Sequence, residues 1–363
     1  MTTGKNQFGS KKKVLRALIA TVGCAALAMG GYGCTQAQPD PDEVKVIEIK
    51  VSHNQSETHY QTKWLEEVAK RVEEKTNGQV KLTIYSSSQL GTIEDLIDQA
   101  LAGSDVMTLH NWAQAATLGG VPNIAAISAM YTFTAPEGQS GPGAIYPLIQ
   151  KLLDSDLFAG WKAELADNGF ILVTANWYMG ERHIYTDNPN GHPTPEDLKG
   201  IALRVPGGVT WQAYFKETPA TIVTMDGSEV YTAMQQGTLN GAEGPFAQTL
   251  GWSLHELTKS VTLTGHGNDT QGFMLGEKTW NKLSEEQQKI LVEAFVWGGD
   301  EYTKETIANV EADQKKFEDL GIPIYEADRD AYRALSDLAY TSAAFPEWDP
   351  DVRQQIREVT GQS

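Results

Sequence analysis

The chain has 363 residues, of which 40% are hydrophobic and 21% are charged, a composition that is ordinary for a soluble globular protein of about two domains. The formal net charge of −18 at pH 7 excludes binding to nucleic acid or to an anionic membrane surface through the overall field of the protein. Both cysteines, Cys24 and Cys34, lie near the N-terminus, so thiol chemistry and cysteine-based zinc sites are excluded from the rest of the chain.

The N-terminal segment predicts export to the periplasm. Residues 1–33 carry basic side chains and no acidic one, and they contain the run VLRALIATVGCAALAMG, which is too short and too interrupted to span a membrane. We therefore expect residues 1–33 to be an export signal and residues 34–43 to be a flexible tether. Lipidation of Cys34 is one expectation, because a glycine precedes it in GGYGC. Gly31 departs from the usual lipoprotein pattern, so cleavage near Ala37 to give a free protein is the alternative.

The next segment predicts strands alternating with helices. VIEIKVSHN (46–54) is typical of a buried strand, and QVKLTIY (79–85) is the next strand. Between them we expect an amphipathic helix from about Glu57 to Thr76. A second helix, IEDLIDQALAG, is expected to end at Gly103, and the strand VMTLHNW (106–112) follows it.

This alternation predicts a parallel sheet with helices on its faces. In such sheets, ligands bind at the carboxyl ends of the strands. Asn54, His110 and Trp112 stand at such ends, so we expect them at the lip of a cleft.

The second half of the chain continues with elements of both kinds. FILVTANWY (170–178) predicts a strand, and the extended segment GIALRVPGG (200–208) follows a loop rich in turn residues. GSEVYTAMQQG (227–237) predicts a helix. Residues 284–321 predict a helix that begins with a capping box, ends at a glycine and is kinked at Gly298 and Gly299.

Arg204 is a single arginine in the apolar segment GIALRVPGG. A guanidinium group is always charged and is seldom buried unless it is paired. An internal acid, such as Asp197 or Glu229, is one candidate partner, and a ligand is the other. Position in the sequence alone favours the internal acid.

Four phrases, in this order, resemble the solute-binding subunits of TRAP transporters, the tripartite ATP-independent periplasmic systems of the DctP-like family. They are EEVAKRVEEKTNGQVKLTIYSSSQLG, PEDLKGIALRVP, SEVYTAMQQGTLNGAEGP, and VTLTGH followed by KTWNKLSEEQQKIL. The resemblance runs from about Val46 to Tyr325. It implies an α/β, two-lobed periplasmic-binding-protein fold (type II-like) with crossing strands between the lobes and a long helix that spans both.

The resemblance also implies domain boundaries and a function. Residues 44–179 plus 270–309 are expected to form lobe I, and residues 180–269 plus 310–363 are expected to form lobe II. The implied function is the capture of a small organic acid and its delivery to TRAP membrane permease subunits, without enzymatic activity, cofactor or metal.

Three residues match positions at which the family contacts its ligand. Arg204 matches the arginine that pairs with the ligand carboxylate, a role that suits the planar fork of a guanidinium. Arg182 matches a second arginine, at the end of a crossing strand, and its alternative is a solvated loop arginine. Asn54 matches a polar contact, and its alternative is an Asx turn that starts the first helix. The expected ligand contacts are Asn54, His110, Trp112, Arg182, Arg204, Gly208, Trp211, Glu243, Gly244 and Phe246.

Departures from the family pattern bear on the ligand. The family usually has asparagine where this chain has Gly244, so an amide is missing and space is expected to open. Trp112 and Trp211 replace smaller residues, and further rings are expected near the cleft at Trp177, Tyr178 and Phe246. Such a pocket suits an aromatic or bulky monocarboxylate, although rings at such positions also form cores. A C4-dicarboxylate or a 2-oxo acid remains open, and His110 could contact a hydroxyl or keto oxygen of the ligand or be structural.

Other classes of protein share parts of this pattern. A secreted hydrolase that uses carboxylates is one alternative, but the sequence contains no G-x-S-x-G, H-E-x-x-H or phosphate-loop motif. His53 and His59 are not spaced like a convincing pair of metal ligands. A binding protein of an ABC importer or of a sensor is another alternative, because the sequence does not reveal the membrane partner.

Overall fold

The computed structural model describes residues 46–341 and 343–362. The expected export signal, the tether and Cys34 lie outside these residues. Within them, none of the helices combines the length and the apolar character that crossing a membrane requires.

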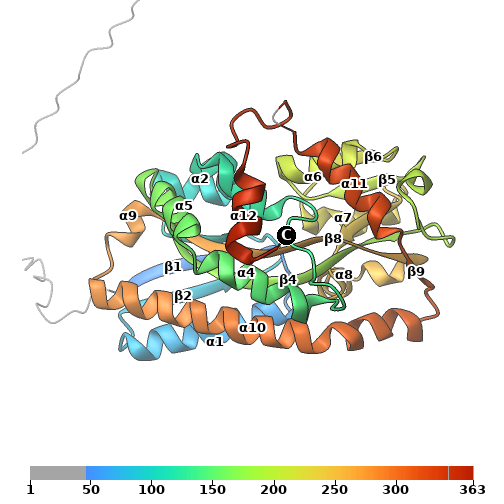
Figure 1. The fold of residues 1–363 in the computed structure, drawn as a ribbon. Coiled ribbons are helices and arrows are strands. Elements are labelled where there is room, and N and C mark those ends of the chain that lie inside the picture. The colour runs from blue at the N-terminus through green and yellow to red at the C-terminus, as the bar shows by residue number, and fades with distance from the viewer. Residues whose placement is uncertain (1–45, 342, 363) are drawn as a thin grey trace, which may run out of the picture. The chain divides into compact units, whose positions relative to one another are not determined.

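The described part of the chain forms one mixed sheet of nine strands, in the order β2-β1-β3-β8-β4-β7-β5-β6, with β9 paired to β8 (Figure 1). The strands are β1 (Ile47–Ser52), β2 (Val80–Tyr85), β3 (Val106–His110), β4 (Phe170–Thr186), β5 (Ala202–Val205), β6 (Thr221–Thr224), β7 (Gly241–Gly244), β8 (Ser260–Gly276) and β9 (Ile324–Glu326). Strand β1 pairs in parallel with β2 and β3, and β5 pairs in parallel with β6 and β7. The long strands β4 and β8 are antiparallel and connect these two parallel groups. This is the expected two-lobed α/β fold with crossing strands.

Helices alternate with these strands along the chain and pack on the sheet. They are α1 (Tyr60–Lys75), α2 (Ile93–Ala102), α3 (Trp112–Gly119), α4 (Pro142–Leu153), α5 (Asp156–Asp167), α6 (Val209–Lys216), α7 (Gly227–Gln235), α8 (Phe246–Gly251), α9 (Glu277–Trp280), α10 (Glu285–Asp319), α11 (Arg329–Ala339) and α12 (Val352–Thr360), with short 3-10 turns at η1 (Pro122–Ser128), η2 (Pro195–Leu198) and η3 (Leu254–Glu256). Helix α2 ends at Gly103 as predicted, where a φ of 105° favours glycine.

Helix α3 corrects the expectation of a strand over 106–112. The strand ends at His110, and Asn111 caps the helix that begins at Trp112. The Asn111 side chain accepts a hydrogen bond from the backbone of Gln114, whose side chain bonds back to the backbone of Asn111. This reciprocal cap stabilises the first turn of the helix.

Helix α10 is 35 residues long and begins with the predicted capping box of Ser284 and Gln287. It lies beside α1 and extends past the middle of the sheet (Figure 1). The structure places Gly298 and Gly299 within one continuous helix rather than at an end. A Cβ atom at Gly298 would collide with Val68 of α1, so the glycine allows the two helices to approach closely.

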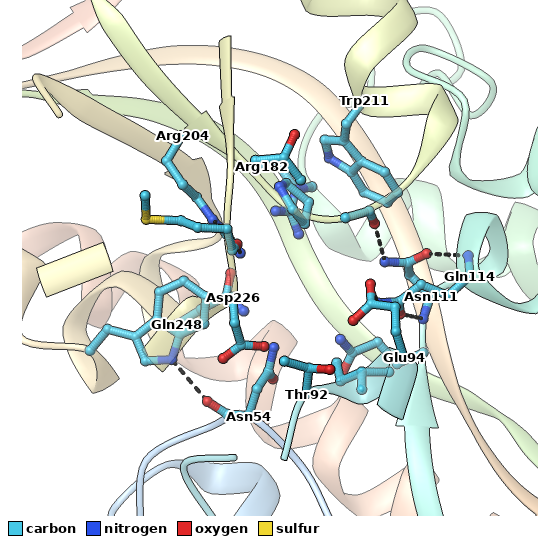
Figure 2. A pocket seen from close by; sticks show the side chains of 17 residues that line it. Asn54, Thr92, Glu94, Asn111, Gln114, Arg182, Arg204, Trp211, Asp226 and Gln248 are labelled. Carbon is cyan, nitrogen blue, oxygen red and sulfur yellow. Dashed lines mark hydrogen bonds between the residues drawn. The ribbon is translucent and has the colours of Figure 1, made fainter. Parts of the chain in front are cut away.

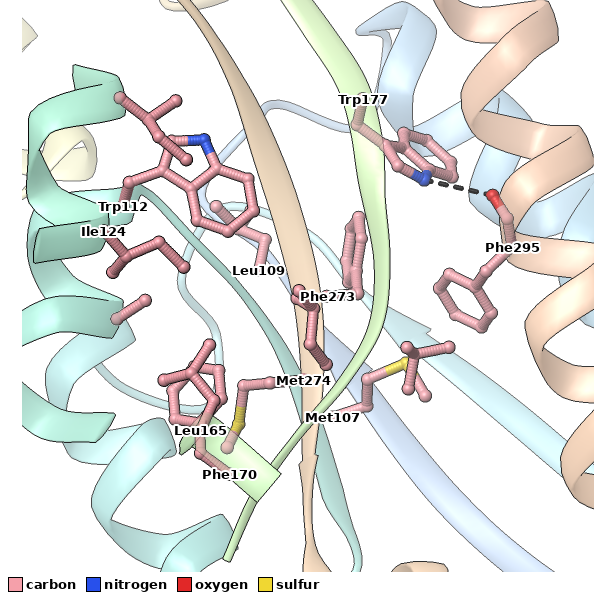
Figure 3. Close-up of a cluster of buried hydrophobic side chains, with 14 of the residues drawn as sticks. Met107, Leu109, Trp112, Ile124, Leu165, Phe170, Trp177, Phe273, Met274 and Phe295 are labelled. Carbon is pink, nitrogen blue, oxygen red and sulfur yellow. Dashed lines mark hydrogen bonds between the residues drawn. The ribbon is translucent and has the colours of Figure 1, made fainter. Parts of the chain in front are cut away.

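The largest hydrophobic cluster packs on both faces of the first parallel group of strands and their β4–β8 neighbours. Figure 3 shows Trp112 on one side of these strands and Trp177 with Phe295 on the other. Val352 and Ile356 of α12 belong to the same cluster. The boundaries of the two lobes stay a prediction.

Candidate functional site

A cavity of about 250 Å³ lies where the parallel strands of both groups end at their carboxyl termini (Figure 2). Each of these strands is followed by residues of the lining, as expected for ligand sites in α/β sheets. The lining consists of Asn54, Thr92, Ile93, Glu94, Asn111, Gln114, Arg182, Arg204, Pro206, Gly207, Trp211, Thr224, Met225, Asp226, Gln248, Trp252 and Gln271. It contains four of the expected ligand contacts, namely Asn54, Arg182, Arg204 and Trp211.

Arg204 reaches the cavity from β5 and is only 2% exposed. Its Nε and Nη2 atoms donate hydrogen bonds of 3.0 and 2.8 Å to the carbonyl oxygen of Met225. The guanidinium lies over the ring of Trp252, with its Cζ 5.3 Å from the ring centroid. Burial lowers the pKa of Arg204 to about 10, so the side chain is still a cation at neutral pH.

The internal acids that we considered for Arg204 lie elsewhere. Asp197 accepts hydrogen bonds from the backbone and side chain of Thr194, and Glu229 is exposed on α7. Among the carboxylates of the described residues, none forms an ion pair with Arg204. Its charge is therefore balanced only by a neutral carbonyl and by more distant acids.

Arg182 lies within β4 and is buried, so the alternative of a solvated loop arginine is wrong. Its Nε and Nη2 atoms donate hydrogen bonds of 2.7 and 2.6 Å to the two carboxylate oxygens of Glu243. Nε2 of His266 lies 2.9 Å from Oε2 of Glu243. Burial acts to raise the pKa of Glu243. The positive charge of Arg182 and the hydrogen bonds from Arg182 and His266 outweigh this effect and lower the pKa of Glu243 below its usual range.

Sequence analysis did not identify two further carboxylates that line the cavity. Figure 2 shows Glu94 and Asp226 among the side chains that line the same cavity as the two arginines. Oε1 of Glu94 accepts a hydrogen bond of 2.7 Å from Nε2 of Gln114. Oδ1 of Asp226 accepts one of 3.0 Å from Ser88. Both acids lie in the first turn or at the cap of a helix that follows a strand, and this position is the signal that could have identified them.

Three hydrogen bonds join the two parallel groups at the cavity. One is the bond from Ser88, after β2, to Asp226, after β6. Nδ2 of Asn111, after β3, donates to the carbonyl oxygen of Gly207, after β5, at 3.2 Å. Nε1 of Trp252, after α8, donates to the carbonyl oxygen of Asn54, after β1, at 3.2 Å. These bonds hold the two groups of strands together around the cavity.

Three aromatic positions expected at the ligand belong to the hydrophobic interior. Trp112 is fully buried, and its Nε1 donates to Thr270 at 3.3 Å. His110 is fully buried, and burial lowers its pKa to about 4. Phe246 packs against Tyr185 and Phe317. None of the three side chains belongs to the lining of the cavity, and their contact with a ligand stays a prediction. Trp177 and Tyr178 lie in the core as well.

Glu243, Gly208 and Gly244 lie behind or beside the lining. The carboxylate of Glu243 is fully buried against Arg182, and its expected contact with a ligand stays a prediction. A Cβ atom at Gly208 would lie 2.9 Å from the Cβ atom of Ala113 of α3. At Gly244 the expected open space is absent, because a Cβ atom there would lie 2.8 Å from Oε1 of Gln248.

In the part of the chain that the structure describes, no group of three or more histidine, cysteine, aspartate or glutamate side chains could hold a metal ion. The charged groups of the cavity are thus arginines and carboxylates alone. Such an arrangement can bind an anion at the guanidinium groups and hydrogen-bond donors at the carboxylates.

Comparisons with known proteins agree with this geometry. Residues 51–345 match the family described as bacterial extracellular solute-binding protein, family 7. The sialic acid-binding periplasmic protein SiaP of Vibrio cholerae is 27% identical over 291 residues, which cover 80% of this chain and 84% of that protein. Among solved structures, a TRAP periplasmic solute-binding protein of Actinobacillus succinogenes with bound L-galactonate has a TM-score of 0.79 at 27% identity and covers 87% of this chain and 100% of its own. One from Ochrobacterium anthropi with bound L-fuconate has the same TM-score and identity, over 87% of this chain and 99% of its own.

Proposed function

The chain belongs to family 7 of the bacterial extracellular solute-binding proteins, the binding subunits of TRAP transporters, and on this basis we propose that it captures a small monocarboxylate paired with Arg204. As a member of this family it is a binding protein rather than an enzyme. The proposed site comprises Arg204, Arg182, Asn54 and Trp211, in the closed cavity between the two lobes.

The observation that carries the proposal is the guanidinium of Arg204. It is buried in the cavity wall and bonded to a single carbonyl oxygen. Leaving a cation in this state is unfavourable, because burial removes water and no described carboxylate replaces it. A ligand carboxylate would supply the missing charge through charge-assisted hydrogen bonds, which are strong in a site closed to water.

The charges of the cavity favour one carboxylate on the ligand rather than two. Glu243 already forms an ion pair with Arg182, so Arg204 is the cation left for a ligand charge. Glu94 and Asp226 also line the cavity, and they would repel a second carboxylate. The same two acids can accept hydrogen bonds from hydroxyl groups of the ligand.

The body of the ligand has two candidate forms. The relatives named above bind sialic acid, L-galactonate and L-fuconate, and a hydroxylated acid of this kind suits the polar lining and the small volume of the cavity. An aromatic or bulky monocarboxylate is the second candidate, because the indoles of Trp211 and Trp252 line the cavity.

We further propose that the bound acid is delivered to the membrane permease subunits of a TRAP transporter. Proteins of this family are periplasmic, which agrees with the export signal expected in residues 1–33. Attachment of the protein to a membrane through Cys34 stays a prediction.

A thermal-shift panel tests the proposal. We expect L-galactonate or phenylacetate to raise the melting temperature, and we expect galactitol, which lacks the carboxylate, and succinate, which has two, to leave it unchanged. A ligand at 100 times its Kd stabilises the folded state by about 2.7 kcal/mol, which is readily measured. Equal shifts with L-galactonate and galactitol would contradict the role of the carboxylate, and a shift with succinate alone would contradict a single charge.

A further inference from the structure

We propose that Trp211 and Gln248 select a ligand that carries a hydroxyl group on the carbon next to its carboxylate. This inference rests on the proposed function, because it takes the carboxylate to lie at the arginines of the cavity. It concerns the class of acid that the site prefers.

Both side chains belong to the lining of the cavity, and each carries a buried polar atom without a partner among the described residues. Trp211 is 1% exposed, and Gln248 is 4% exposed. Among the described residues, no group accepts a hydrogen bond from Nε1 of Trp211, and none donates one to Oε1 of Gln248. Most buried polar groups in proteins are hydrogen-bonded, so two orphaned atoms in one cavity wall need an explanation.

The two side chains lie beside the same guanidinium group. Cζ of Arg182 lies 5.5 Å from the centroid of the Trp211 ring. The Cβ position of Gly244 is 2.8 Å from Oε1 of Gln248 and 3.9 Å from Nη2 of Arg182. Trp211, Gln248 and Arg182 line the same cavity as Arg204 (Figure 2), so a ligand in this cavity lies next to both side chains.

Gly244 makes room for the amide of Gln248. Any side chain at this position would meet Oε1 of Gln248 closer than carbon and oxygen normally approach. Because Gly244 has no side chain, the amide oxygen of Gln248 has room to lie near Arg182. Thr249, its neighbour on α8, instead bonds to the backbone of Pro245.

The two atoms have opposite hydrogen-bonding roles. The indole N–H of Trp211 only donates, and the amide oxygen of Gln248 only accepts. A hydroxyl group satisfies both, because it accepts one hydrogen bond and donates another. An oxo group satisfies only Trp211, and a methylene group satisfies neither. Each orphaned group that a ligand leaves buried is expected to cost on the order of tenfold in affinity.

Calorimetric titration of two matched series tests this preference. One series is gluconate, 2-oxogluconate and 2-deoxygluconate, and the other is mandelate, phenylglyoxylate and phenylacetate, with both enantiomers of mandelate. We expect the hydroxy acid of at least one series to bind the wild-type protein about tenfold more tightly than its oxo analogue. We expect a still larger ratio, on the order of a hundredfold, against the analogue with a methylene group.

The variants Trp211→Phe and Gln248→Met remove one polar atom each and keep the size of the side chain. We expect both to reduce the preference for the hydroxy acid by about tenfold, while the acid with the methylene group binds within a few-fold of its wild-type affinity. Gln236→Met, on the exposed end of α7, is the matched control and should keep the full preference.

The outcomes separate this inference from the function on which it rests. If the acids bind the wild-type protein equally well in every series that binds, or if the preference survives both variants, the hydroxyl inference is overturned and capture of a monocarboxylate stands. If no acid of either series binds the wild-type protein, both are overturned.

Discussion

At the scale of single residues, Arg204 and Arg182 differ in the partner that balances each charge. Arg182 forms two hydrogen bonds with a carboxylate inside the protein, whereas Arg204 bonds only to a backbone carbonyl. We therefore propose different tasks for the two arginines. Glu243 fixes Arg182 in place, and Arg204 keeps its charge for a ligand.

The variant Glu243→Gln tests the structural half of this division. It leaves the buried guanidinium of Arg182 without its counter-charge, so we expect the free energy of unfolding to fall by about 3 kcal/mol. Urea unfolding followed by circular dichroism measures this loss. Asp319→Asn, which breaks the exposed ion pair with Lys315, is the control and should cost less than about 1 kcal/mol. A loss for Glu243→Gln no larger than that of the control would contradict the assignment.

Prediction at the level of residues depended on the family resemblance as well as on chemistry. A lone guanidinium in an apolar segment needs a partner, and its position alone favoured an internal acid. The resemblance indicated a ligand instead, and Arg204 lies in the cavity wall. The directions of Trp112 and Phe246 could not be predicted, because an aromatic ring at the end of a strand can turn to the cavity or to the core. Only the packing of helices on the sheet decides this direction, and both rings are buried there.

At the scale of elements, two helical glycines of this chain occupy opposite environments. A Cβ atom at Gly298 of α10 would collide with Val68 and lie 3.2 Å from the ring of Trp177. Gly160 of α5 is exposed and has no such neighbour among the described atoms within 4 Å. Alanine is normally the better helix former, so the two sites separate propensity from packing.

We therefore expect Gly298→Ala to destabilise the protein by about 1–3 kcal/mol through overpacking. Gly160→Ala should stabilise it by about 0.5–1 kcal/mol through helix propensity. The midpoints of urea unfolding of the two variants provide the comparison. Stabilisation by both substitutions would show that α10 does not need glycine for its contact with α1.

The sequence predicted most elements because hydrophobic periodicity and capping residues are local signals. The start of α10 at Ser284 and the end of α2 at Gly103 are examples. Helix α3 was missed, although Asn111 and Gln114 form a capping box, because an apolar run was extended into it. Strand β4 continues to Thr186 rather than ending at 178, since pairing with β8 and β7, and not local propensity, sets its end.

At the scale of the whole molecule, the arrangement depends on contacts between distant segments. Strand β8 inserts between β3 and β4 in the sheet, and no local pattern in the sequence predicts this order. The resemblance to a family implied only that crossing strands connect the two lobes and that later residues complete lobe I. The residues that close the cavity, such as Asn111 with Gly207, come from segments that are far apart in sequence, so their meeting was also beyond local inference.

The central claim is that the charge of Arg204 is completed by the carboxylate of the ligand. Calorimetric titration tests this claim. The ligand is the acid of the thermal-shift panel that most stabilises the wild-type protein, and the variants are Arg204→Ala and Arg204→Lys. The control is Arg353→Lys, because Arg353 stacks on Tyr340 outside the cavity. We predict no measurable binding to the alanine variant, at least about tenfold weaker binding to the lysine variant because a point charge cannot replace the fork, and unchanged binding to the control, with all three variants folded. Binding of the acid to Arg204→Ala with wild-type affinity would contradict the account.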